Sequence, residues 1–160
     1  MFFKFFDSNA FVGCATLITA IVALFLYLAA EQRNRSNAAK IVIQEIRRAE
    51  KMIEDIKQTE VSVLGTKIIV TNSWGKNMHY FVDEFEIDEL DKVSNLYAVG
   101  EYLDLILNKV FQDKAFASAE NFQKIDSLPW RQQVQAIVAK YQPVYNSNIG
   151  TKFKKIADQQ

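Results

Sequence analysis

The sequence predicts an all-α protein, with a single N-terminal transmembrane helix followed by a small helical cytosolic domain. Three observations lead to this fold class. Residues 8–30 carry no charged side chain. In several later stretches apolar residues recur every three or four positions, the period of an amphipathic helix. The 160 residues include only two prolines and five glycines, so few positions favour turns or end helices.

The uncharged stretch at 8–30 is expected to cross a membrane. As an α-helix it would be about 34 Å long, enough for a hydrocarbon core of roughly 30 Å. A cleavable signal peptide is the alternative, but the apolar run is too long and Leu28 stands where cleavage after Ala30 requires a small residue. We therefore divide the chain into a short N-terminal segment at 1–8, a transmembrane helix at 9–30, a helical stalk at 31–60 and a helical cytosolic domain at 61–160.

Basic residues on the two sides of the span predict its orientation. Only Lys4 precedes the span, whereas Arg33, Arg35 and Lys40 follow it closely. Segments rich in Lys and Arg stay in the cytoplasm, so we expect the N-terminus outside and the C-terminal domain inside. The single cysteine, Cys14, lies within the span, so the soluble part forms no disulfide and suits a reducing compartment.

The stalk carries an apolar stripe with spacings of 4, 3, 4 and 3 residues, the period of a coiled-coil seam. The stripe consists of Val42, Ile46, Ala49, Ile53 and Ile56. It covers barely two heptads, so pairing with another chain and packing within the chain's own domain both remain open. No residue between Ala30 and Asn37 breaks a helix, so span and stalk are expected to form one continuous rod.

Small residues recur at every fourth position of the span, at Ala15, Thr19 and Ala23. Such a row lets two helices approach closely in lipid, where packing replaces the hydrophobic driving force. Together with the stripe on the stalk, it predicts that the protein is a homo-oligomer.

Further helices are expected beyond the stalk. Residues 61–70 are rich in β-branched side chains but have no partner strand, so we expect irregular structure or a frayed helix end there. Residues 71–73 can cap a short helix at about 76–82, and Asp88 can cap the helix that runs to about Gln112. The apolar face of that longer helix consists of Leu90, Val93, Leu96, Tyr97, Gly100, Leu103, Leu107 and Val110.

Two more helices complete the expected bundle. The first carries apolar residues from Trp130 to Tyr141, with Ser127 as its cap and Pro143 as its stop. The second is short and basic and buries Phe153 and Ile156.

The residue types exclude most kinds of chemistry. The chain has 19 basic and 19 acidic residues, so we expect no DNA binding. One cysteine and one histidine cannot form a zinc site, and the acidic segment 83–91 lacks the glycine of a calcium loop. The five glycines are isolated, so no phosphate-binding loop is present. We expect no metal, no cofactor and no enzyme; His79 with Asp83 one helical turn later is the weak basis for a hydrolase.

A ligand-binding surface is the remaining possibility. Arg47, Arg48 and Lys51 lie within little more than one helical turn, and Lys152, Lys154 and Lys155 form a second basic group. If oligomerisation brings copies of the chain together around an axis, these groups are expected to bind a phosphate-bearing ligand such as a nucleotide. Attraction of the same charges to anionic lipid headgroups is the alternative.

The segment from Lys40 onward resembles a group of uncharacterised bacterial single-span membrane proteins. The resembling parts are residues 43–50 (IQEIRRAE), 72–74 (NSW), 88–91 (DELD) and the Tyr97 region. The resemblance implies a protein of the bacterial inner membrane and brings no catalytic residues. In architecture alone, the chain is also similar to small membrane effectors of CRISPR antiphage defence, which bind cyclic oligoadenylate through a cytosolic domain.

Two functions follow as expectations. The first is a membrane-anchored, non-enzymatic helical interaction protein that self-associates and recruits a cytosolic protein. The alternative is a ligand-gated effector of antiphage defence that senses a cytosolic cyclic oligonucleotide.

Overall fold

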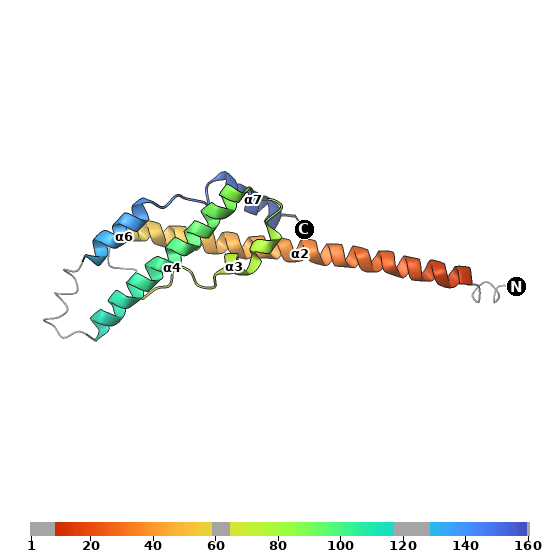
Figure 1. The fold of residues 1–160 in the computed structure, drawn as a ribbon, viewed down its shortest axis with the longest axis horizontal. Coiled ribbons are helices and arrows are strands. Elements are labelled where there is room, and N and C mark those ends of the chain that lie inside the picture. Colours follow the sequence, from red (N-terminus) through yellow and green to blue (C-terminus); the bar gives the residue numbers. More distant parts are fainter. Residues whose placement is uncertain (1–8, 59–64, 117–128, 160) are drawn as a thin grey trace.

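The computed structural model describes residues 9–58, 65–116 and 129–159, and every regular element in these ranges is helical. The all-α fold class is confirmed. Figure 1 shows one long helix whose C-terminal half lies along the shorter helices, while its N-terminal half extends away from them. The segment expected at 1–8 and the cap expected at Ser127 lie outside the described residues.

Helix α2 runs without interruption from Asn9 to Gln58, so the expected continuous rod is confirmed. Its 50 residues extend about 75 Å. The apolar part near the N-terminus has a mean hydropathy of 2.4, and none of it is buried in the protein. Leu17, Phe25 and Leu26 are each more than 60% exposed. This is the one stretch of the described residues that is long and apolar enough to cross a membrane.

The stripe on the second half of α2 forms the core of the chain's own domain. Val42, Ile46, Ala49 and Ile53 are fully buried and Ile56 is 4% exposed. These side chains pack within the chain's own domain, which is the second of the two alternatives that the sequence left open, and they are not available as an oligomer seam. The residues expected to form a stalk contact the later helices of the described chain, so the second half of α2 packs against the helical domain.

Two helix starts differ from the sequence-based expectation. Helix α3 spans Ser73–Asn77, and η1, a 3₁₀ turn, spans Met78–Tyr80, where one helix at 76–82 was expected. The Asn72 side chain caps α3 by accepting a hydrogen bond from the Gly75 backbone N–H at 3.0 Å. Helix α4 spans Ile87–Ala115 and is capped by Glu86, not Asp88. Its capping box pairs Glu86 with Glu89, each side chain accepting from the other's backbone N–H.

Helices α6 and α7 close the bundle, at Trp130–Ala139 and Asn148–Ala157. Helix α7 lies along α2, with which it makes the most extensive contact between any two helices. The Ser36 hydroxyl on α2 donates to the Ala157 carbonyl oxygen at 2.7 Å, which fixes the end of α7. The expected basic helix with buried Phe153 and Ile156 is therefore present.

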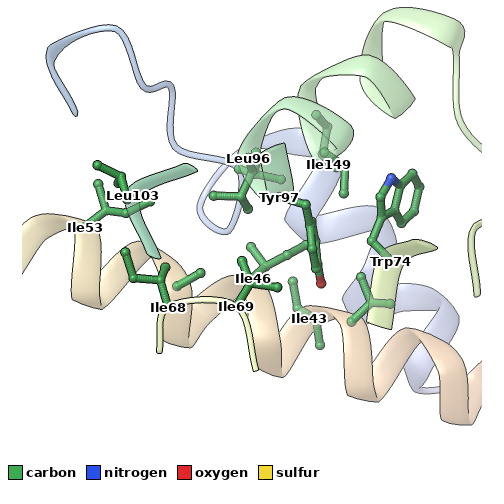
Figure 2. Packing of buried hydrophobic residues seen from close by; sticks show 14 of the residues in the cluster. Ile43, Ile46, Ile53, Ile68, Ile69, Trp74, Leu96, Tyr97, Leu103 and Ile149 are labelled. Carbon is green, nitrogen blue, oxygen red and sulfur yellow. The ribbon is translucent and has the colours of Figure 1, made fainter. Parts of the chain in front are cut away.

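The core is a single buried cluster to which α2, α3, α4, α6, α7 and the segment 65–72 all contribute. Figure 2 shows side chains from several of these parts pointing toward one another, among them Ile46 and Ile53 of α2 and Leu96 and Leu103 of α4. Seven of the eight residues expected on the apolar face of α4 are buried; Leu90 is half-buried. Residues 65–70 form the expected irregular segment, which inserts Ile68 and Ile69 into the core.

A buried carboxylate fixes the irregular segment to α2. Glu45, 8% exposed, accepts hydrogen bonds from the backbone N–H groups of Thr71 and Ser73, at 2.8 and 2.7 Å. It also accepts from the hydroxyls of Thr71, Ser73 and Tyr97. Burial by itself would raise the pKa of Glu45, but the hydrogen bonds from Ser73 and Thr71 outweigh it and lower the pKa to about 2.

Candidate functional site

The two basic groups of the sequence meet at one aromatic ring. The Lys154 Nζ of α7 lies 4.0 Å from the centre of the Tyr145 ring. The Arg47 guanidinium carbon of α2 lies 5.8 Å from the same ring. Both distances are in the range of cation–π attraction. Residues 107 positions apart in the chain thus place two positive charges on one side chain.

A carboxylate on α2 holds the backbone that carries Tyr145. Glu50 Oε1 accepts hydrogen bonds from the backbone N–H groups of Val144 and Tyr145, at 2.5 and 2.8 Å. The two bonds join the α6–α7 connection to the helix that carries Arg47. Since Val144 is buried, the segment packs into the core at this point. The hydrogen bond to Glu50 fixes the backbone of Tyr145, and the half-buried ring contacts the two cations.

The start of α7 fixes the same segment from the other side. The Ser147 side chain caps α7 by accepting from the Ile149 backbone N–H at 3.1 Å and itself donates to the Val144 carbonyl oxygen at 2.6 Å. At Gly150 the backbone comes so close to the segment that a Cβ would lie 1.9 Å from the Tyr145 carbonyl oxygen. Only glycine fits there.

The electrostatic balance of this cluster is positive. Arg47 and Lys154 contribute two positive charges. Glu50 contributes one negative charge, and its carboxylate accepts two backbone hydrogen bonds from Val144 and Tyr145. Burial raises the pKa of the Tyr141 phenol, and the nearby Glu50 carboxylate raises it further, so Tyr141 stays neutral. An exposed pair of cations beside an aromatic ring suits an anion that also has a planar group, such as a nucleotide.

The other predicted basic residues are placed differently. Arg48 and Lys51 are exposed, and no ion pair involves either within the described part of the chain. Lys152 points elsewhere and pairs with Glu89 of α4, with 2.5 Å between Nζ and Oε2. Lys155 is exposed. Of the six predicted residues, therefore, the structure brings Arg47 and Lys154 together at one ring.

Sequence reasoning missed Tyr145 and Glu50. Tyr145 lies in the connection between two helices, where periodicity carries no information. Glu50 lies on α2 among many other charged residues, and its position in the sequence does not distinguish it from them. The motif Pro-Val-Tyr at 143–145 between two predicted helices was the available signal for an ordered connection, but nothing in it indicated the carboxylate partner.

The structure does not join His79 and Asp83. His79 is exposed, and its ring packs against that of Tyr80 with 4.0 Å between ring centres. Among the described residues no hydrogen bond links His79 to Asp83, and no cluster of three His, Cys, Asp or Glu side chains is close enough to hold a metal ion. The geometry expected of a catalytic dyad is absent from this part of the chain.

A cavity of about 710 Å³ lies between the segment 65–72 and α4. Its two carboxylates are already used by the fold. Asp104 accepts from the backbone N–H groups of Ile68 and Ile69, at 2.6 and 3.0 Å, and Glu101 accepts from the Asn72 side-chain amide at 2.7 Å. These bonds hold the segment against α4, so the two carboxylates of this cavity have a structural role.

The small residues Ala15, Thr19 and Ala23 line a shallow groove on one face of α2. The Thr19 hydroxyl donates to the Ala15 carbonyl oxygen at 2.9 Å, and Thr16 donates to Val12 at the same distance. The hydroxyls are thus satisfied within the helix, which leaves a narrow, uncharged face. That face is the geometry that close helix packing in lipid requires.

The chain matches no protein-family model, no curated protein and no solved structure. The resemblance to bacterial single-span membrane proteins therefore rests on the sequence motifs alone and stays a prediction.

Proposed function

We propose that the protein is a membrane-anchored, non-enzymatic interaction protein that presents a small helical domain at the cytoplasmic face of a bacterial inner membrane. The observation that carries this proposal is the exposure of apolar side chains around the N-terminal part of α2. In water such a surface would be strongly unfavourable, because each Å² of apolar surface costs about 25 cal/mol. In a bilayer the same side chains would contact lipid tails, which are also apolar, so their exposure carries no such cost.

The orientation follows from the charges beside this stretch. Arg33, Arg35 and Lys40 follow it, whereas Lys4 is the single basic side chain before it. Basic residues close to the end of a span are retained in the cytoplasm. The domain that packs around the second half of α2 is therefore proposed to be cytoplasmic.

Membrane insertion can be tested on the full chain with alkaline carbonate washing of membranes and protease treatment of spheroplasts and inverted vesicles. We expect the chain to stay in the pellet and its domain to be cleaved in inverted vesicles alone. A variant with Leu17→Arg and Leu24→Arg should be released, because each central Arg costs about 2.5–3.5 kcal/mol of insertion. A matched control, Leu17→Phe with Leu24→Phe, should remain. Release of the unmodified chain would refute the anchor.

Self-association through the span is part of the proposal. The groove at Ala15, Thr19 and Ala23 supports it, whereas the stripe on the cytoplasmic half of α2 is buried and unavailable. Thr19→Leu would fill the groove and is expected to reduce crosslinked dimer in membranes. Leu28→Ala, at an exposed position on the opposite face of the same helix, serves as the control. Unchanged crosslinking of Thr19→Leu would exclude this face as the interface.

A second candidate function is a ligand-gated membrane effector that senses a cytosolic cyclic oligonucleotide. The convergence of Arg47 and Lys154 on Tyr145 favours it. With α2 along the membrane normal, Arg47 lies about 25 Å beyond Ala30. Charges of a bilayer surface are screened over about 8 Å at physiological salt. Attraction to anionic lipid is therefore weak at this distance, and a soluble anion is the better partner.

The ligand proposal is tested with the full chain in detergent, using cyclic tri-, tetra- and hexa-adenylate, with inorganic phosphate as a separate probe. We expect a cyclic oligoadenylate to raise the melting temperature, and Arg47→Ala or Lys154→Ala to abolish the rise. Lys76→Ala, which removes an exposed charge on α3, should retain it. The effector proposal fails if no nucleotide shifts the melting temperature or if Arg47→Ala responds like the unmodified chain. A shift with inorganic phosphate alone would identify a general anion site.

A further inference from the structure

The continuous helix determines how far the domain stands from the proposed membrane. The first contacts between α2 and the domain are made by Arg35 and Ser36. Arg35 Nη2 lies 2.6 Å from Glu84 Oε1, and the Ser36 hydroxyl donates to the Ala157 carbonyl oxygen at 2.7 Å. These residues follow Ala30, the last apolar residue of the span, by about 7.5–9 Å of helix.

A bilayer's polar layer has about the same thickness. A hydrocarbon core of about 30 Å within a total of about 40–45 Å leaves about 5–7.5 Å of headgroups on each side. The domain thus begins where the headgroups end, and no chain between Ala30 and Arg35 departs from the helix. No spacer separates the domain from the lipid surface.

We propose that the turn at 81–86, with the adjoining C-terminal end of α7, is a membrane-facing surface that rests on the lipid headgroups. This inference rests on the proposed function, in which α2 crosses the bilayer. The Arg35–Glu84 ion pair places the turn beside the emerging helix, and the Ser36–Ala157 hydrogen bond does the same for α7. In Figure 1 the C-terminus lies near the point where α2 leaves the domain.

The turn is built to hold a fixed shape. Phe81 is fully buried and Phe85 is 6% exposed, and their rings lie 5.0 and 4.6 Å from the Phe153 ring centre. The backbone N–H groups of Glu84 and Phe85 both donate to the Phe81 carbonyl oxygen, at 3.0 and 3.2 Å. Two aromatic anchors therefore hold the turn, and the residues between them face outward.

An apolar side chain stands on this outward face. Val82 is 51% exposed, although both flanking aromatic anchors are buried. In water about half of the Val82 side chain faces solvent, whereas at the proposed membrane surface the same side chain lies against the lipid headgroups. The charges nearby are of both signs: Arg33 and Arg35 on α2, Asp83 and Glu84 on the turn, and Asp158 after α7. Such a mixture suits zwitterionic headgroups, so contact should not require anionic lipid.

The test uses the full chain in phosphatidylcholine vesicles, with Cys14→Ala as the background so that single cysteines can carry a spin label. Labels are placed at Val82→Cys on the turn, at Leu24→Cys in the span and at Leu105→Cys on α4. Leu105 is an apolar residue with 69% exposure, which makes it the matched control for Val82. The measurement is the accessibility of each label to oxygen, which concentrates in lipid, and to a water-soluble nickel complex.

We expect the label at 24 to be protected from the nickel complex and the label at 105 to be fully accessible to it. The label at 82 should be several-fold less accessible to the nickel complex than the label at 105, while it stays accessible to oxygen. Doubling the salt should leave this order unchanged. If 24 is protected while 82 and 105 are equally accessible, the membrane-facing surface is refuted and the anchor stands. If 24 is accessible, the anchor itself is refuted. Protection of 82 from both oxygen and nickel would identify contact with a second copy and overturn the lipid assignment.

Discussion

Tyr97 of α4 donates a hydrogen bond to Glu45 of α2, with 3.1 Å between the Tyr97 hydroxyl oxygen and Glu45 Oε2. The Ser73 hydroxyl lies 3.0 Å from the same Tyr97 oxygen. Burial raises the pKa of Tyr97, so the phenol remains a donor, whereas Glu45 remains a carboxylate and an acceptor. This buried charge joins α2, α3 and α4, and the stability of the domain should depend on its ionisation.

The first prediction concerns acid stability. The pKa of Glu45 is about 2 in the folded chain, against an ordinary value of 4.5. Its contribution to stability is therefore complete above pH 4.5 and is lost as the pH falls toward 2. The difference corresponds to roughly 3 kcal/mol, at about 1.4 kcal/mol per pKa unit. Urea unfolding of the full chain in mild detergent at pH 7 and pH 3 should show about 2 kcal/mol of this loss, because pH 3 still lies above the folded pKa.

Two variants separate the carboxylate from the hydroxyl. Glu45→Gln should lower the free energy of unfolding at pH 7 and remove most of its decline between pH 4.5 and 2. The smaller decline that remains arises from Glu89. Burial by itself would raise the pKa of Glu89, but the hydrogen bond from Lys152 lowers it below its ordinary value. Tyr97→Phe should cost about 1–2 kcal/mol and keep the full decline. A steep acid transition in Glu45→Gln would contradict the assignment.

A second prediction concerns the apolar stripe of α2. Ile46 is fully buried, so Ile46→Ala should lower the free energy of unfolding by about 2–4 kcal/mol through lost burial and a cavity. Ile41→Ala, at a position 52% exposed on the same helix, should change it by less than about 1 kcal/mol. Thermal denaturation at several protein concentrations is the measurement.

Because the contact is intramolecular, the loss in Ile46→Ala should be the same at every protein concentration. A melting temperature that rises with concentration would instead show that folding of the domain is coupled to association.

A third prediction addresses the close approach at Gly150. A Cβ there would lie 1.9 Å from the Tyr145 carbonyl oxygen and 2.9 Å from the Val144 carbonyl oxygen. Gly150→Ala must therefore displace the backbone of the α6–α7 connection, at a cost of about 2 kcal/mol or more. Gly13→Ala is the control, because a Cβ at Gly13 has no neighbour within 4 Å. Differential scanning calorimetry should show a lower melting temperature for Gly150→Ala alone.

The fourth prediction tests the carboxylate that holds the Tyr145 segment. Glu50→Ala removes the acceptor of two backbone N–H groups, which should cost about 1–3 kcal/mol. Hydrogen exchange at Val144 and Tyr145 should accelerate. Glu54→Ala, one turn further along α2, removes an exposed pair with Lys57 and should change stability by less than about 1 kcal/mol. If both amides exchange as slowly in Glu50→Ala as in the unmodified chain, another group holds the segment.

Periodicity in the sequence was enough to predict where α2 and α4 bury their side chains. The spacing of Ile46, Ile53, Leu96 and Leu103 reports which face of a helix is apolar, and the structure packs those faces together. What the spacing could not decide was the partner of each face. A stripe of two heptads looks the same whether a second chain or the chain's own α4 and α7 covers it.

The polar contacts were the part that could not be predicted. Glu45 and Glu50 have the same residue type and lie on one helix beside other charges, yet each accepts backbone hydrogen bonds from a distant segment. Such partners are separated by up to 95 residues, and a single sequence carries no signal for contacts at that range. The convergence of Arg47 and Lys154 at Tyr145 depends on those same anchored segments, so it too emerged from the structure alone.

Because α2 is one unbroken helix, a tilt of its apolar part also tilts the part that carries the domain. About 42 Å of the helix, from Glu31 to Gln58, continues beyond its apolar part. A tilt of about 20°, the average for helices in bilayers, would carry Gln58 sideways by about 14 Å. If α2 crosses a bilayer as proposed, thinning or thickening of that bilayer would change the tilt of α2 and move the whole domain sideways.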